Sequence, residues 1–349
     1  MREHPCARAI RRRQSRLVLL LVMTVVLSLS WSPGVEAQKL KLASSVRSLF
    51  SLPLYVANNL GWFKEAGLDV EIFNFRGGAE ASRAILGGST DMQAAATENM
   101  FKVIDQGQPM RALMNVQGPV NGGILVSKSV VQRLGRKPTV NDLKGLRIAT
   151  LARGGLADML VRYVLTTAKL DPDRDAILKP ILGFPAHIAA MKAGEIDGTM
   201  AIEPFNTMLV DTLKLADYVF DILAGEGPEI FQEIAYVSLQ ARVSWLEKNL
   251  ATAEKVVRTL VRAQSFVVDP ANFEEVVKVA QKEFPDANPE VLRKSVRRQL
   301  HSYAPHLTKK AVENNNILLT TNKLISRPLK YEEVVDARFV KFWDAFKKK

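Results

Sequence analysis

The sequence is nearly free of cysteine and poor in histidine. Its single cysteine is Cys6, and only His187, His301 and His306 lie beyond residue 37. The chain after residue 37 therefore has no thiol with which to form a disulfide, attack a substrate or bind a metal. These histidines show neither a metal-binding spacing nor the order typical of a Ser/His/Asp arrangement. We therefore expect no catalytic residue, no metal site and no cofactor.

Long apolar runs are also absent beyond the N-terminal segment. Residues 1–16 are rich in arginine, and the run Leu17–Leu29 is shorter than the roughly 20 residues that span a bilayer. Val35 and Ala37 place small side chains where a signal peptidase cuts. This pattern predicts a signal peptide at 1–37, cleaved after Ala37, and a soluble periplasmic protein. A retained membrane anchor is the alternative, and we expect the general secretory route rather than the twin-arginine route.

Charge of one sign is in excess but is not concentrated. The formal net charge is +12, and the lysines and arginines are scattered or terminal, as in residues 347–349. Such a distribution is typical of a solvated surface that helps to attract anions. The sequence has no zinc-finger spacing and no basic stripe interleaved with aromatic residues, so we expect no nucleic-acid partner.

One phrase occurs twice in the chain, about a hundred residues apart. Residues 81–98 and 186–205 each read as a short helix, then Gly-x-x-Asp, then a strand of small apolar residues. The glycine permits the left-handed turn that ends a helix, and the aspartate is expected to bond N–H groups of the turn. The repeat predicts two α/β lobes with buried parallel strands. Ligands of such folds bind beyond the carboxyl ends of the strands, where Thr97-Glu98 and Glu203-Pro204 lie.

Two glycine turns precede helices and are candidates for ligand contact. Gly77-Gly78 and Arg153-Gly154-Gly155 expose backbone N–H groups at the positive end of a helix dipole. Arg153 is the one cation placed directly in such a turn, and it would clamp an anionic group with about 1.5–3 kcal/mol. The alternatives are a plain flexible turn and a surface arginine. The chain lacks the nucleotide P-loop and the dinucleotide fingerprint.

Two carboxylates at the expected strand ends add a second kind of charge to this site. Glu98 and Glu203 beside Arg153 would repel a bare inorganic anion, which favours an organic ligand with an anionic end and a donating or cationic end. The alternative for Glu203 is that it only caps the helix that follows Pro204.

Beyond Val243 the pattern predicts helices at 245–269, 273–283, 290–302, 309–325 and 334–346.

Several stretches resemble one protein family. Pro53–Ala57 with Gly61–Val70, Asp142–Ala149, Ala193–Asp197 and Glu203-Pro204-Phe205 are similar to motifs of periplasmic substrate-binding proteins of ABC importers for sulfonates, taurine, nitrate and thiamine pyrimidine precursors. The resemblance runs from Lys39 to the C-terminus. The loop after the first strand, residues 44–50, matches no single subfamily, so the ligand stays open.

The resemblance implies a type II periplasmic binding protein with two α/β lobes, two crossover strands and a ligand cleft between the lobes. The lobes would be 38–123 with 240–349, and 124–239. We expect a monomer that delivers its small-molecule ligand to a permease and its ATPase. From the resemblance and the residue arguments together, the expected ligand contacts are Ser45, Ser48, Leu49, Phe50, Gly77, Gly78, Thr97, Glu98, Arg153, Gly154, Gly155 and Glu203.

Two other functions fit the same fold. An enzyme of this fold that makes a thiamine pyrimidine is one, but its motif is rich in cysteine, and this chain has none after Cys6. A periplasmic sensor domain that partners a kinase is the other. A neighbouring permease and ATPase in the genome would separate an importer component from a sensor.

Overall fold

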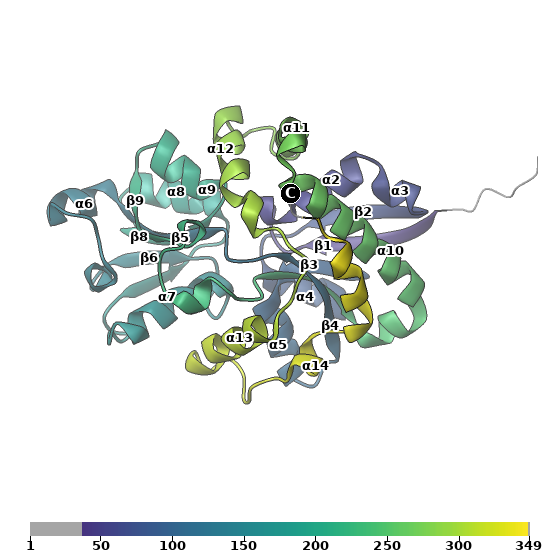
Figure 1. Cartoon of the computed structure of the whole chain (residues 1–349). Helices are drawn as coiled ribbons and strands as arrows, with labels where there is room; N and C mark the ends of the chain where they lie inside the picture. Colours follow the sequence, from purple (N-terminus) through teal and green to yellow (C-terminus); the bar gives the residue numbers. More distant parts are fainter. Residues whose placement is uncertain (1–36, 348–349) are drawn as a thin grey trace, which may run out of the picture. The chain divides into compact units, whose positions relative to one another are not determined.

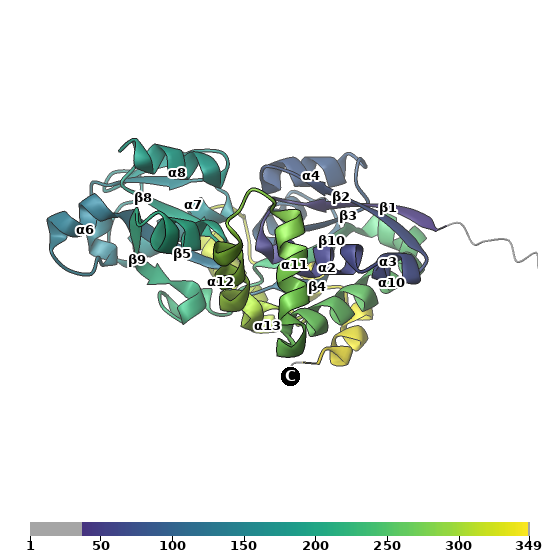
Figure 2. The same cartoon turned by 90° about the horizontal axis from the view of Figure 1, so that it is seen from above.

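The computed structural model describes residues 37–347, so the predicted signal peptide lies outside the described residues apart from Ala37. The described chain contains ten strands in two sheets (Figures 1 and 2). In chain order they are β1 (Gln38–Ser44), β2 (Leu68–Asn74), β3 (Met92–Ala96), β4 (Met110–Gln117), β5 (Gly122–Ser127), β6 (Arg147–Thr150), β7 (Ile177–Pro180), β8 (Gly198–Ile202), β9 (Ala216–Asp221) and β10 (Val237–Arg242).

The two sheets share one plan. The strand order is β2-β1-β3-β10-β4 in the first sheet and β7-β6-β8-β5-β9 in the second. The fourth strand of each order, β10 or β5, is antiparallel to both of its neighbours, while the first three strands run parallel. The predicted pair of α/β lobes is therefore confirmed, and below we call the parts around these sheets the first and second lobes.

The chain passes between the lobes twice. It leaves the first sheet after β4 and enters the second as β5, and it returns after β9 as β10. Each incoming strand becomes the antiparallel member of the sheet that it joins. Glycine is required at the first entry, because a Cβ on Gly122 would lie 2.1 Å from the backbone oxygen of Ala201. The glycine pair of this crossover thus lets strands approach closely, rather than only making the chain flexible.

The repeated aspartates have matching roles in the two lobes. Asp91 Oδ2 accepts a hydrogen bond of 2.8 Å from the Lys41 amide in β1, and Asp197 Oδ2 accepts one of 2.9 Å from the Arg147 amide in β6. The bond reaches the neighbouring strand rather than the turn that the sequence suggested. Each aspartate thereby sets the register of a buried strand, β3 or β8, beside its parallel neighbour, β1 or β6.

Helices surround the sheets. The α-helices are α2 (Leu52–Asn59), α3 (Trp62–Glu65), α4 (Gly78–Leu86), α5 (Thr97–Asp105), α6 (Lys128–Leu134), α7 (Leu156–Thr167), α8 (Phe184–Lys192), α9 (Phe205–Thr207), α10 (Val243–Val268), α11 (Phe273–Glu283), α12 (Pro289–Gln299), α13 (Lys309–Thr321) and α14 (Tyr331–Val334). Single turns of 3-10 helix connect several of them. The helix that we expected at 334–346 is mostly 3-10 helix, at Ala337–Ala345.

The C-terminal helices link both lobes. Helices α10 and α11 pack on α2 of the first lobe, whereas α12 packs on α9 and α13 on α7 of the second lobe. Figures 1 and 2 both show α11 beside α2. Among residues 37–347, none of the helices combines the length and the apolar character that a membrane crossing needs.

Candidate ligand-binding site

A cavity of about 310 Å³ lies between the lobes, where the carboxyl ends of the parallel strands meet. The first lobe contributes the loop after β1, the start of α4, the start of α5 and part of β10. The second lobe contributes the segments that follow β6 and β7, and the end of β8. Ligands of open α/β sheets bind at this edge, so the position agrees with the strand-end argument.

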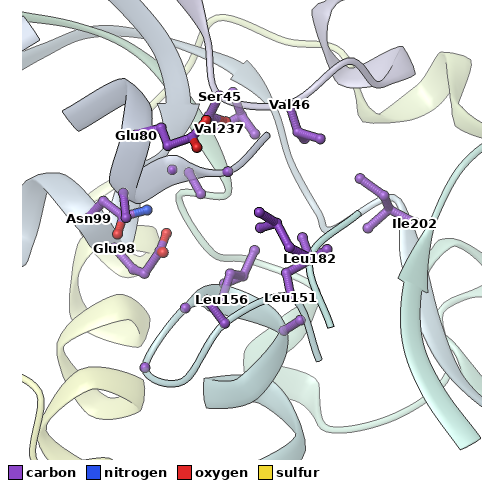
Figure 3. A pocket seen from close by; sticks show the side chains of 18 of the residues that line it. Ser45, Val46, Glu80, Glu98, Asn99, Leu151, Leu156, Leu182, Ile202 and Val237 are labelled. Atoms are coloured by element: carbon purple, nitrogen blue, oxygen red, sulfur yellow. The ribbon is translucent and has the colours of Figure 1, made fainter. Parts of the chain in front are cut away.

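Most of the wall is apolar. Figure 3 shows Leu151, Leu156 and Leu182 of the second lobe facing Glu98 and Asn99 of the first. Ile202, at the end of β8, forms a further side. Such a surface favours a ligand with an apolar body, because burying that body removes it from water.

Four helices of the described chain begin at this cavity. Gly78 starts α4, the segment from Ala96 to Glu98 starts α5, Leu156 starts α7 and Phe184 starts α8. The backbone favours glycine at residue 154, and at residue 78 a side chain would have to displace Asn99. Gly154 has a φ of +70°, and a Cβ on Gly78 would lie 2.2 Å from the side-chain amide nitrogen of Asn99. The helix starts give the cavity a partly positive electrostatic environment.

Glu98 is the buried carboxylate of this cavity. Its residue is 1% exposed, and its Oε2 atom has no hydrogen-bond partner among residues 37–347. Its Oε1 atom lies 3.9 Å from the ammonium group of Lys102. Burial raises the pKa of Glu98, while Lys102 and the backbone N–H groups of Glu98, Asn99 and Leu156 act in the opposite direction. The carboxylate is therefore buried with only part of its hydrogen-bonding capacity used.

The cationic side chains near the cavity are mostly bonded to other protein groups or exposed to solvent. Lys102 donates a hydrogen bond of 2.8 Å to the Gly154 carbonyl, across the gap between the lobes. The Arg153 side chain is 78% exposed and lies 3.5 Å from Asp173. Arg83 lines the cavity but is also exposed. Among the described residues, Lys102, which is half-buried, is therefore the cation adjacent to Glu98.

The structure brings most of the predicted contact residues to this cavity. Those that line it are Ser45, Phe50, Gly77, Gly78, Glu98, Arg153, Gly154 and Gly155. Whether they contact a ligand stays a prediction. Four other residues of the predicted set, Ser48, Leu49, Thr97 and Glu203, do not line it.

The four remaining residues hold the fold together around the cavity. Ser48 Oγ donates 3.1 Å to the Glu203 carbonyl, which joins the lobes. Leu49 is buried, and its carbonyl accepts 2.6 Å from the Tyr303 hydroxyl. The Thr97 hydroxyl shares a 2.9 Å hydrogen bond with that of Ser238.

The Glu203 carboxylate is fully buried, and both of its oxygen atoms accept hydrogen bonds. Arg298 Nε donates a hydrogen bond of 2.8 Å to its Oε1 atom. Ser295 Oγ and Thr207 Oγ1 donate hydrogen bonds of 3.0 and 2.8 Å to its Oε2 atom. The Thr207 backbone N–H donates 3.3 Å to the same Oε2. Arg298 also pairs with Asp221. These contacts agree with the alternative in which Glu203 orders the turn and caps the next helix.

The sequence argument missed residues on both lobes. Leu182 and Phe184 of the second lobe line the cavity, as do Asn99, Lys102 and Val237 of the first. The repeat contained a signal for one of them, Phe184. When the two copies of the repeat are aligned at Gly88 and Gly194, Gly77-Gly78 corresponds to Gly183-Phe184. The turn at Gly183-Phe184 was therefore a candidate for ligand contact, like the turn at Gly77-Gly78. Lys102 carried no such signal, because its role depends on a turn in the other lobe.

Comparison with known proteins supports the same fold. The sequence profile of the NMT1-like family matches residues 35–281. The putative binding protein YtlA of Bacillus subtilis is 28% identical, over 85% of this chain and 87% of that protein. The nitrate/nitrite binding protein NrtA of Nostoc sp. is 24% identical, over 71% of this chain and 58% of that protein.

Solved structures with this fold include binding proteins and an enzyme. The alkanesulfonate-binding protein SsuA from Xanthomonas axonopodis pv. citri, bound to MOPS, gives a TM-score of 0.70 at 19% identity, over 86% of this chain and 99% of that one. The periplasmic aliphatic sulphonate binding protein SsuA from Escherichia coli gives a TM-score of 0.68 at 16% identity, over 88% of this chain and 98% of that one. The desulfurization enzyme DSZB gives 0.63 at 15%, over 89% and 100%.

Proposed function

The chain belongs to the NMT1-like family, and from this premise we propose that it is the solute-binding component of an ABC importer. It captures a small organic ligand between its lobes and presents it to a permease, which an ATPase drives. The observation that carries the proposal is the cavity between two α/β lobes, lined from both sides and joined across the gap by Lys102 and Gly154. A site that closes in this way suits capture and release.

The proposed ligand is a small organic anion or zwitterion. The helix starts at Gly78 and Leu156 favour negative charge, and Arg153 adds a cation at the rim. The apolar wall requires an organic body, and Glu98 disfavours a bare inorganic anion such as nitrate. The SsuA structure bound to MOPS is an example of this fold with an organic sulfonate.

We place the mature protein in the periplasm as a monomer. Strand β1 begins at Gln38, the residue after the predicted cleavage site, which supports removal of 1–37. The proposed lobes are 38–123 with 240–349, and 124–239; in support, the strand that enters the second sheet begins at Gly122 and the strand that returns to the first begins at Val237.

A thermal-shift screen tests the proposed function. The panel contains sulfonates, carboxylates, amino acids, nitrate and thiamine precursors, because only compounds that prefer the folded protein raise its melting temperature. We expect at least one organic anion or zwitterion to do so, and small-angle scattering to show a monomer that becomes more compact with it. Stabilisation by nitrate alone would contradict the proposed ligand class. A multimer that never compacts would contradict lobe closure.

An enzymatic function is the second candidate, since the desulfurization enzyme DSZB shares the fold. Among residues 37–347, the cavity is lined by no cysteine and no histidine. His187 is instead buried against Thr199 Oγ1 at 2.8 Å and the Ile181 carbonyl at 2.7 Å. Turnover of a stabilising compound, followed by mass spectrometry, would favour the enzyme. Retention of the compound unchanged favours the binding protein.

A further inference from the structure

Two buried glutamates follow corresponding strands of the two lobes, and they differ in the hydrogen bonds that their carboxylates accept. Glu203 follows β8, and its carboxylate receives hydrogen bonds from Arg298, Ser295 and Thr207. Glu98 lies one residue further along after β3, and its Oε2 atom receives none from the described residues. A buried carboxylate with one oxygen unpaired has lost hydration that its contacts replace only in part, so such a group needs an explanation.

The free oxygen of Glu98 belongs to a group that faces the cavity rather than the protein core. Figure 3 shows the Glu98 side chain at the cavity wall, opposite Leu151 and Leu182. The side chains of the facing wall are apolar and have no hydrogen to donate, and the Leu156 backbone N–H is the donor of this wall that acts on the carboxylate. Lys102, the nearest cation, is 3.9 Å from the other oxygen and already donates to Gly154. The unpaired oxygen of Glu98 can therefore accept a hydrogen bond from a molecule that fills the cavity.

The same contacts restrict the chemistry of the occupant. An anionic group next to Glu98 would place two negative charges together, with Lys102 as the cation and the N–H groups of the helix starts to offset them. An ammonium or N–H group there would instead form a charge-assisted hydrogen bond, shielded from water by Leu151, Leu156 and Leu182. If the ligand also has an anionic end, the exposed Arg153 at the rim is the cation left for it.

We infer that Glu98 is the specificity-determining residue of this cavity. The ligand presents an amine or N–H donor to Glu98 Oε2, carries an apolar body against the leucine wall, and directs any anionic group towards the rim. This inference rests on the proposed binding function and changes its ligand class: zwitterions remain, plain organic anions are removed and amines are added. It selects amine-bearing organic molecules and zwitterions over plain carboxylates, sulfonates and inorganic anions.

Calorimetry with matched probes tests this inference. The protein is unfolded and refolded to remove any co-purified ligand. It is then titrated with 4-methylbenzylamine, 4-methylbenzoate, 4-methylbenzenesulfonate and the zwitterion 4-(aminomethyl)benzoate, which share one aromatic body. We expect the two amines to bind at least about 10-fold more tightly than the two anions. Glu98→Gln should weaken the amines by about 10- to 100-fold. Glu71→Gln, an exposed change of the same charge on β2, should leave binding unchanged.

Each result separates this inference from the function on which it rests. If the anions bind at least as tightly as the amines, or if Glu98→Gln binds the amines as the unchanged protein does, the inference is wrong and a binding function still stands. If none of the four binds, the same comparison is made between the best compound of the thermal-shift panel and its amine-free analogue. If no compound of that panel binds either, the proposed function fails together with the inference.

Discussion

Lys102 of α5 donates a hydrogen bond of 2.8 Å to the carbonyl oxygen of Gly154, in the turn before α7. The two residues belong to different lobes, and both line the cavity between them. The ammonium group also lies 3.9 Å from Glu98. One side chain thus couples the closure of the lobes to the charge of the proposed ligand-binding site.

We expect Lys102→Met to speed ligand release. The substitution removes a hydrogen bond from a charged donor that exists only when the lobes are together, so the closed state loses up to about 1.5–3 kcal/mol. Affinity should fall by about 10-fold or more, mainly through a faster dissociation rate in stopped-flow measurements. Lys39→Met, an exposed lysine of β1, is the matched control. An unchanged dissociation rate in Lys102→Met would show that this contact does not hold the lobes closed.

Arg153→Ala should weaken binding by less than about fivefold. The sequence alone suggested a larger loss, but the side chain is 78% exposed and lies 3.5 Å from Asp173. Exposed ion pairs contribute about 0–1 kcal/mol and are screened by salt. Titration calorimetry at low and high salt checks this, with the loss disappearing at high salt. A salt-independent loss of 100-fold would show that Arg153 enters the closed site.

Glu98→Gln should stabilise the ligand-free protein at neutral and higher pH. Burial raises the pKa of Glu98 in the folded state, so the folded protein binds this proton more tightly than the unfolded chain does. Stability from this group is present below the unfolded pKa of about 4.3 and is lost as pH rises through the folded pKa. The gain in the variant should therefore grow with pH. Urea unfolding from pH 4 to pH 8 measures it, and a variant less stable at pH 8 would assign Glu98 a structural role.

Arg298→Met should destabilise the protein strongly. The change leaves the fully buried Glu203 carboxylate without its cation, which costs about 3–5 kcal/mol. Glu203→Gln combined with Arg298→Met should recover part of that loss, since the buried charge is then removed. A double-mutant cycle by urea unfolding gives the coupling. Glu203→Gln alone should leave the preference among ligands unchanged, because this side chain does not line the cavity; an altered preference would return Glu203 to the site.

Much of the fold could be predicted from the sequence because it depends on the pattern of residues that are neighbours along the chain. The repeated Gly-x-x-Asp phrase indicated two α/β lobes, and Asp91 and Asp197 do occupy matching positions beside β1 and β6. The periodic apolar residues after Val243 indicated the C-terminal helices. The glycine turns and the strand ends pointed to the edge where the cavity lies. Each of these features is decided by neighbours along the chain.

The distribution of roles among the polar residues was decided only by the tertiary structure. Glu98 and Glu203 are alike in sequence context, yet Arg298, almost a hundred residues after Glu203, reaches one and leaves the other open. Lys102 acquires its contact from a turn in the opposite lobe. Leu182 completes a wall that faces a helix start from another sheet. The sequence determined which residues lie at the edges of the sheets, whereas the packing of the lobes decided which of those residues satisfy one another and which remain free for a ligand.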